Sequence, residues 1–144
     1  MALEDIYTEL IGEHSRNPEN KHHLAHATCA LKGHNPSCGD EITLELQIEN
    51  GVVKDASFTG VGCAISQAST DIMLGMIVGK SREEALRLGD LFLRMIRGEA
   101  SEEEIDSLEE ASALRDVSHM PARVKCAMLG WRTLREALGE KTPS

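Results

Sequence analysis

Three cysteines that lie far apart in the chain place the strongest constraint on its fold. Cys38, Cys63 and Cys126 belong to different segments, and Asp40 follows the first of them by two residues. Thiolates and a carboxylate are ligand types that hold zinc, usually four around one tetrahedral ion. The chain contains no CxxC pair, so a shared site would require a fold that brings three distant segments together. Such a site would suggest a chemically active centre rather than a metal that only stabilises one short segment.

The length and charge of the chain narrow the classes of protein it can belong to. Its 144 residues predict a single domain over residues 1–144, with residues 139–144 as a frayed tail. The net charge of −9 argues against a nucleic-acid partner, since phosphate binding requires a clustered positive surface. No apolar run approaches the ~20 residues that span a bilayer. The first residues also lack the basic start and apolar stretch of a secretion signal.

These features predict a cytoplasmic protein with no membrane partner. In that reducing compartment, four cysteines indicate metal ligands or reactive thiols. The alternative is two disulfides, which would require an oxidising compartment that nothing else in the sequence supports.

Residues 42–58 carry the pattern of a β-hairpin. Apolar residues at 42, 44, 46 and 48 alternate with polar ones, which predicts a half-buried strand. Asn50-Gly51 supplies the positive φ values of a two-residue turn, and residues 52–58 return as the partner strand. Residues 27–31 could add at most one short strand. The sheet should therefore be antiparallel, with about three strands.

Apolar residues recur at helical spacing in the other segments. The N-terminal segment ends at Asn17-Pro18, and Gly79 and Gly98 end two later ones. Capping signatures begin at Ser81 and Ser101. The predicted helices lie near residues 3–11, 65–77, 82–96, 101–108 and 121–138. Strands followed by helices predict an α+β fold in which helices pack on one face of a small sheet.

The positions of the thiols relative to these helices favour ligands over core residues. Cys126 points away from the apolar face of its helix, whose centre lies near Trp131. Cys63 precedes a helix, where unpaired backbone amides favour a thiolate. Cys38 and Asp40 project to the same side of an extended chain. All four side chains could therefore reach one ion.

The carboxylate decides what kind of zinc site these residues would form. Asp40 is the hardest donor of the four and the one most readily displaced, and a site that can open is typical of catalysis. Arg123 lies three residues before Cys126, so it could offset the negative charge or contact a sulfur species. Two alternatives remain open: zinc that only holds the segments together, and three unrelated buried cysteines.

Two further groups of candidate ligands are expected to be bystanders. Cys29 lies in a weakly patterned segment and is interpreted as a strand residue. His22, His23 and His26 are close in sequence and could suggest a second metal site. Exposed polar histidines in a loop are the preferred interpretation.

Several motifs resemble the U-type iron–sulfur assembly proteins. Residues 3–10 and 14–18 are similar to the opening of that family, and residues 35–40, 60–66 and 121–126 are similar to its three cysteine motifs. The resemblance runs from residue 3 to about residue 138. IscU-type scaffolds carry histidine before the last cysteine and a shorter stretch between the second and third. Here Lys125 precedes Cys126, and 63 positions separate it from Cys63, which is similar to the SufU branch.

The resemblance implies a zinc-dependent sulfurtransferase that accepts persulfide sulfur from a cysteine desulfurase of the SufS type. By position, Cys38, Asp40, Cys63 and Cys126 would be the zinc ligands. Cys38 would accept the sulfur, and Arg123 matches a family arginine near the site. The alternative is a non-enzymatic scaffold on which the same ligands assemble an iron–sulfur cluster. Downstream cluster-assembly proteins would then be further partners.

Overall fold

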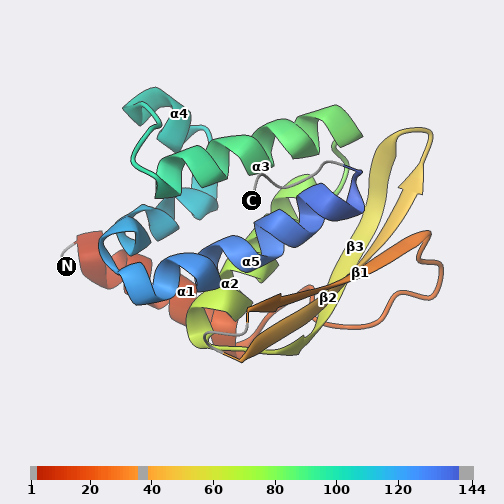
Figure 1. Ribbon diagram of the computed structural model, residues 1–144, viewed down its shortest axis with the longest axis horizontal. Coiled ribbons are helices and arrows are strands. Elements are labelled where there is room, and N and C mark those ends of the chain that lie inside the picture. The colour runs from red at the N-terminus through yellow and green to blue at the C-terminus, as the bar shows by residue number, and fades with distance from the viewer. Residues whose placement is uncertain (1–2, 36–38, 140–144) are drawn as a thin grey trace.

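The computed structural model describes residues 3–35 and 39–139. Figure 1 shows a small sheet with the helices gathered on one side of it, which confirms the predicted α+β architecture. The elements in chain order are α1 (Leu3–Arg16), β1 (Cys29–Asn35), β2 (Asp40–Glu49), β3 (Val52–Val61), α2 (Ala64–Ile77), α3 (Arg82–Ile96), α4 (Glu102–Asp106), the 3₁₀ helix η1 (Glu109–His119) and α5 (Pro121–Ala137). From residue 140 onward, the tail expected to fray lies outside the described residues.

The sheet is antiparallel with β2 in the middle. The predicted hairpin is confirmed, since Asn50 and Gly51 adopt φ values of 52° and 75° at the turn between β2 and β3. Ile42, Leu44 and Leu46 are fully buried while the residues between them are partly exposed. One face of β2 therefore packs against the helices, as the alternation indicates.

Strand β1 differs from the prediction, because it begins two residues later than expected and continues to Asn35. It pairs with β2 from Cys29 opposite Leu46 to Asn35 opposite Asp40. Residues 32–35 have little apolar character of their own. Pairing with the long backbone of β2 explains the extra length, and it places Asn35 beside Asp40.

Helix α2 lies at the centre of the molecule, in contact with α1, α5, β3 and η1. Its sequence predicts a single apolar face, but residues 66–74 are all buried. The polar ones are tolerated because their groups find partners. Ser69 Oγ donates to the backbone oxygen of Ala127 at 2.7 Å and accepts from Trp131 Nε1 at 3.1 Å.

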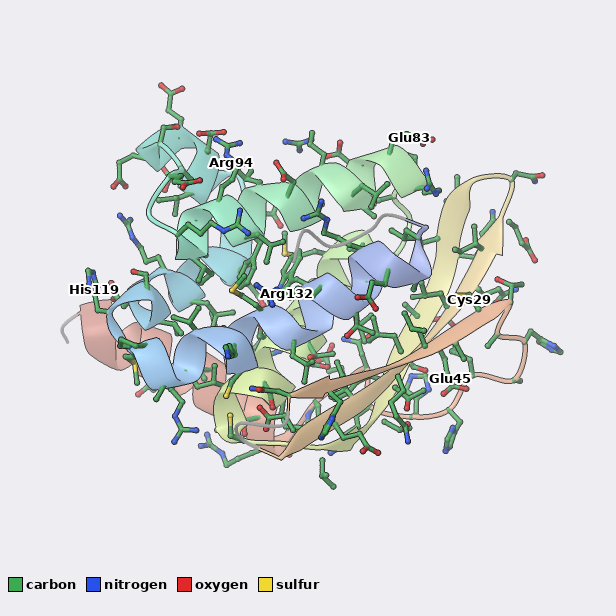
Figure 2. All side chains as sticks on the ribbon, viewed as in Figure 1. Cys29, Glu45, Glu83, Arg94, His119 and Arg132 are labelled. Atoms are coloured by element: carbon green, nitrogen blue, oxygen red, sulfur yellow. The ribbon has the colours of Figure 1, made fainter. Side chains whose placement is uncertain are left out.

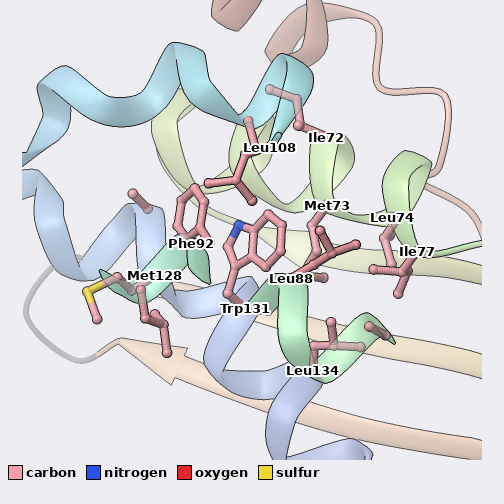
Figure 3. Close-up of a cluster of buried hydrophobic side chains, with 14 of the residues drawn as sticks. Ile72, Met73, Leu74, Ile77, Leu88, Phe92, Leu108, Met128, Trp131 and Leu134 are labelled. Carbon is pink, nitrogen blue, oxygen red and sulfur yellow. The ribbon is translucent and has the colours of Figure 1, made fainter. Parts of the chain in front are cut away.

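The core between the helices is built around one aromatic pair (Figure 3). The Trp131 ring from α5 stacks on the Phe92 ring from α3, with ring centroids 4.3 Å apart. Leu88, Leu108 and Leu134 are buried in the same hydrophobic cluster. Such burial supplies most of the favourable free energy of folding. This packing fixes α5 against α2 and α3. It therefore also holds the first turns of α5 near the sheet.

The helix boundaries follow the capping signals with two exceptions. Ser81 Oγ accepts from the Glu84 amide, and the Ser101 capping box has both of its hydrogen bonds. However, α4 ends at Asp106 rather than Leu108, and the sequence patterns did not predict η1. Glu109 begins η1 with a positive φ of 51°, which interrupts regular helix. In the described part of the chain, no helix combines the length and apolar content that crossing a bilayer requires.

Candidate metal centre

Three of the four predicted ligands meet where β2, α2 and α5 begin. Asp40 is the first residue of β2, Cys63 precedes α2, and Cys126 lies in the second turn of α5. One carboxylate oxygen and the two sulfur atoms all lie within 4.8 Å of one another. This spacing fits three donors around one ion. The fourth predicted ligand, Cys38, lies outside the described residues.

The turn from β3 into α2 places Cys63 beside Asp40. Cys63 is the N-cap residue of α2, and its side chain makes no capping hydrogen bond. Its backbone amide donates to Asp40 Oδ1 at 2.8 Å. A Cβ at Gly62 would clash with Ser66 Oγ and lie 2.9 Å from the same carboxylate oxygen. Glycine is therefore the residue that lets the chain pass this closely.

The Asp40 carboxylate is fully buried but only half satisfied. Oδ1 accepts from the Cys63 amide, whereas Oδ2 has no hydrogen-bond partner in the described structure. An unpaired buried charge costs several kcal/mol unless a counter-ion or donor compensates. A metal cation bound to Oδ2 would compensate this charge. The donor set of one carboxylate and two thiols therefore fits a zinc ion.

Cys126 is fully buried, yet it is not a member of the hydrophobic cluster. This agrees with the expectation that it avoids the apolar face of α5. Asn35 Nδ2 lies 3.9 Å from Cys126 Sγ, within the range of a hydrogen bond to sulfur. An amide donor stabilises a thiolate more than a thiol.

Arg123 supplies positive charge on the exposed side of the centre, which confirms the predicted proximity. Its hydrogen bond to Cys126, together with the charges of Cys63 and Cys126, raises the pKa of the guanidinium above its ordinary value. The side chain is exposed, so an incoming molecule can reach it. It can both offset the charge of the thiolates and contact an anionic sulfur group.

The expected bystanders lie away from this centre. Cys29 is at the opposite end of β1 from Asn35, about 20 Å along the strand. Figure 2 shows Cys29 at one end of the sheet. Its Sγ lies 3.6 Å from the Ala137 carbonyl oxygen, to which it donates. His22, His23 and His26 are exposed, and His23 Nδ1 lies 3.2 Å from Glu45 Oε2. These placements agree with the sequence interpretation.

Sequence reasoning missed two residues beside the centre. Asn35 was noted only as part of the motif over residues 35–40 and given no role, although its amide contacts Cys126. Gln67 was not singled out, although it is buried near Asp40. The one available signal was an amide residue close to a cysteine in sequence, which is too common to identify a site.

Comparison with known proteins places the chain among iron–sulfur assembly proteins. The NifU-like N terminal domain model matches residues 6–141. The chain is 44% identical to the iron–sulfur cluster assembly scaffold protein IscU of Thermotoga maritima, over 96% of both chains. It is 38% identical to the zinc-dependent sulfurtransferase SufU of Bacillus subtilis, over 96% of this chain and 93% of that protein.

Solved structures agree with the sequence relatives. One is a protein of Fervidobacterium islandicum described as a candidate iron–sulfur cluster assembly scaffold for the SUF system. It superposes with a TM-score of 0.83 and 37% identity, over 95% of this chain and 99% of the other. The predicted IscU/SufU-like fold is therefore confirmed. The relatives carry both scaffold and sulfurtransferase names, so they do not separate the two branches.

Proposed function

This chain belongs to the NifU-like N terminal domain family, and we propose that it works in iron–sulfur cluster assembly as a zinc-dependent sulfurtransferase. Its partner would be a cysteine desulfurase of the SufS type. The observation that carries the proposal is the group of Asp40, Cys63 and Cys126, in which Asp40 and Cys126 are buried, Cys63 is partly exposed, and Asp40 Oδ2 has no hydrogen-bond partner among the described residues.

Features of the last cysteine motif favour sulfur transfer over scaffolding. Lys125 stands where IscU-type scaffolds carry histidine, so one potential cluster ligand is replaced by an ammonium group. The stretch between α3 and α5 also contains α4 and η1, which agrees with the longer spacing of the SufU branch.

Cys38 is proposed as the fourth ligand and as the thiol that accepts sulfur. In sequence it stands between Asn35 and Asp40, two residues before the latter. Both of these flanking residues are at the centre, since Asn35 contacts Cys126 and Asp40 lies in the ligand group. Two residues of chain span no more than about 7 Å. We therefore expect Cys38 to lie within reach of the other three ligands.

In the proposed mechanism, the residues of the centre keep the Cys38 thiol deprotonated and protect it from oxidation until sulfur is transferred. Bound zinc would keep the cysteines deprotonated at neutral pH and shield them from oxidation. The Cys38 thiolate would then attack the outer sulfur of the desulfurase persulfide. A new S–S bond forms on Cys38 while the S–S bond of the desulfurase breaks, and the desulfurase cysteine leaves as a thiolate. Arg123 is placed to contact the negative charge of the incoming persulfide.

The test is transfer of labelled sulfur from the desulfurase to this chain. We expect label on the wild-type chain and faster desulfurase turnover when the chain is added. Cys38→Ala should abolish labelling, whereas Cys29→Ala, at the far end of β1, should leave it unchanged. Normal labelling of Cys38→Ala would reject the assignment. An absence of any turnover increase would favour a purely structural zinc site.

The second candidate is a scaffold on which an iron–sulfur cluster is assembled and passed to downstream proteins. The relative with 44% identity carries that name, and thiolates also hold such clusters. Here the cluster is cargo. Metal analysis of protein purified without air separates the two candidates. Zinc would favour sulfur transfer, whereas iron with visible absorbance would favour the scaffold.

A further inference from the structure

Helix α2 buries several polar side chains. In one of them, Gln67, the amide nitrogen has no hydrogen-bond partner among the described residues. Ser66 Oγ donates to the Cys63 carbonyl oxygen, and Thr70 Oγ1 donates to the Ser66 carbonyl oxygen. Gln67 is 6% exposed, and its Nε2 makes no hydrogen bond within the described structure. Buried amide nitrogens are rarely left without an acceptor. This exception therefore calls for a partner that Nε2 can reach.

Lys21 determines which way the Gln67 amide faces. Lys21 Nζ donates to Gln67 Oε1 at 2.8 Å. An ammonium group can only donate, so the amide oxygen must point at Lys21 and Nε2 must point away from it. Lys21 is itself held near β3, where its backbone forms a bridge with Phe58 and its Nζ lies 5.9 Å from the Phe58 ring centroid.

The free amide nitrogen of Gln67 and the Asp40 carboxylate both lie next to Gly62. The point where a Gly62 Cβ would sit lies 3.3 Å from Gln67 Nε2 and 2.9 Å from Asp40 Oδ1. Gly62 has no side chain to separate the two groups. Asp40 Oδ1 already accepts from the Cys63 amide, but a carboxylate oxygen can accept a second hydrogen bond. An unpartnered donor and an under-used acceptor thus stand on either side of one glycine.

We propose that Gln67 is a positioning residue for the metal centre: when the ion is bound, its amide, oriented by Lys21, closes onto the Asp40 carboxylate, donates to it and holds Oδ2 toward the thiolates. This inference rests on the proposed function, because it takes Asp40 as a metal ligand. A donor that hydrogen-bonds to the non-coordinating atom of a metal ligand fixes the orientation of that ligand. The positive charge of Lys21 polarises the amide and strengthens its N–H as a donor.

In this arrangement, hydrogen-bond donors with positive charge lie on two sides of the centre. Arg123 contacts the two thiolates from the exposed side. Gln67 and Lys21 approach the carboxylate from the side of α2 and β3. The two contacts have different roles, because the exposed guanidinium can move toward an incoming molecule whereas the buried amide cannot.

The inference is tested by measuring metal affinity in Gln67→Met, which keeps the length of the side chain and removes the donor. Competition with a chelator gives the affinity for Zn²⁺ and for Co²⁺. We expect both to fall about 10- to 100-fold, and we expect the visible bands of the Co²⁺ form to shift. Lys21→Met should produce a smaller loss in the same direction. Gln47→Met, on the partly exposed side of β2, is the matched control and should bind as the wild type does.

A second pair of variants separates positioning of Asp40 from general packing. In an Asp40→Ala background, Gln67→Met should cause no further loss of affinity, because no carboxylate remains to be held. The inference is overturned if Gln67→Met binds within two-fold of the wild type, or if it weakens binding equally with and without Asp40. A wild-type chain that binds neither metal would also overturn it.

The failure of the proposed function would look different. A chain whose zinc affinity depends on Gln67 but whose Cys38 accepts no sulfur would retain the positioning role and lose the sulfurtransferase. Sulfur labelling and chelator competition on the same variants therefore distinguish the two conclusions.

Discussion

Two buried aspartates, Asp40 and Asp71, are treated very differently by this fold. Asp71 is 1% exposed and accepts hydrogen bonds from the Asn20 backbone amide at 2.9 Å and from Asn20 Nδ2 at 3.1 Å. Its second oxygen lies 2.6 Å from His14 Nδ1. Asp40 is equally buried, but only one of its oxygens has a partner in the described structure.

The histidine beside Asp71 completes a closed network. His14 lies between Asp71 and Glu110, and each ring nitrogen faces a carboxylate at hydrogen-bond distance. An ionised carboxylate only accepts, so this network favours the protonated ring, which can donate from both nitrogens. The network joins α1, α2 and η1.

The comparison teaches how to distinguish structural from functional carboxylates in this molecule. Where both carboxylate oxygens are hydrogen-bonded, as in Asp71, the charge stabilises the fold, and removing it lowers the free energy of unfolding. Where one oxygen has no partner, the fold tolerates an unfavourable group, and a bound cation would compensate it. The two sites should therefore respond in opposite ways to removal of the charge.

The largest expected effect is a loss of stability in Asp71→Asn. The variant leaves the His14 cation without its buried counter-charge, and breaking a buried pair costs about 3–5 kcal/mol. Urea unfolding of the metal-free protein at pH 7 measures this loss. Asp90→Asn, on an exposed position of α3, is the control and should change stability by no more than about 0.5 kcal/mol. A loss below 1 kcal/mol in Asp71→Asn would contradict the structural role.

Asp40→Asn should leave the metal-free protein at least as stable as the wild type. Its oxygen can still accept from the Cys63 amide, while the uncompensated charge is removed. Its affinity for Zn²⁺ should nevertheless fall by at least about 10-fold, the lower range found when even outer partners of a metal ligand are lost. Unfolding with a chelator present and chelator competition measure the two effects. Equal destabilisation by Asp40→Asn and Asp71→Asn would remove the distinction.

The pH dependence of stability should identify the His14 network. Burial lowers the pKa of His14, but the hydrogen bonds to Asp71 and Glu110, with the charges of these carboxylates, outweigh burial and raise the pKa above 6.5. The folded state therefore binds the proton more tightly than the unfolded state. Its contribution is fully present below pH 6.5 and is lost as the pH rises through the folded pKa.

The unfolding free energy of the wild type relative to His14→Gln, measured from pH 5 to pH 9, checks this sign. The advantage of the wild type should be largest at the acidic end and should shrink as the pH rises. An advantage that grew with pH would show that His14 is neutral in the folded protein.

The amino-acid sequence predicted the elements whose cause is local. The hairpin follows from alternation and a turn dipeptide at Asn50-Gly51, and the start of α3 follows from the capping serine Ser81. Ligand chemistry and the resemblance of the cysteine motifs also predicted that Asp40, Cys63 and Cys126 would meet. Each of these inferences depends on residues that are close in sequence or on chemistry that is rare.

The parts that were missed depend on contacts between distant segments. Asp71 lies on a helix whose apolar residues suggest one buried face, and nothing in that local pattern indicates that Asp71 is buried and paired. Its partners come from α1 and from the segment around Asn20. The donors at Gln67 and Asn35 are likewise defined by Lys21 and Cys126, which are far away in the chain. The spacing of apolar residues within one segment gives no information about such long-range contacts.

The smallest expected effect concerns Arg123, which offsets the thiolate charge at the exposed side of the centre. Arg123→Gln should slow sulfur transfer to the chain by about two- to five-fold, because exposed charge contacts are weak. The loss should be larger at low salt than at 0.5 M salt, since screening reduces the wild-type advantage. Arg87→Gln, which removes an exposed arginine paired with Glu84 on α3, is the control and should transfer sulfur normally. A loss that did not depend on salt would mean that Arg123 acts through the geometry of its hydrogen bond to Cys126 rather than through its charge.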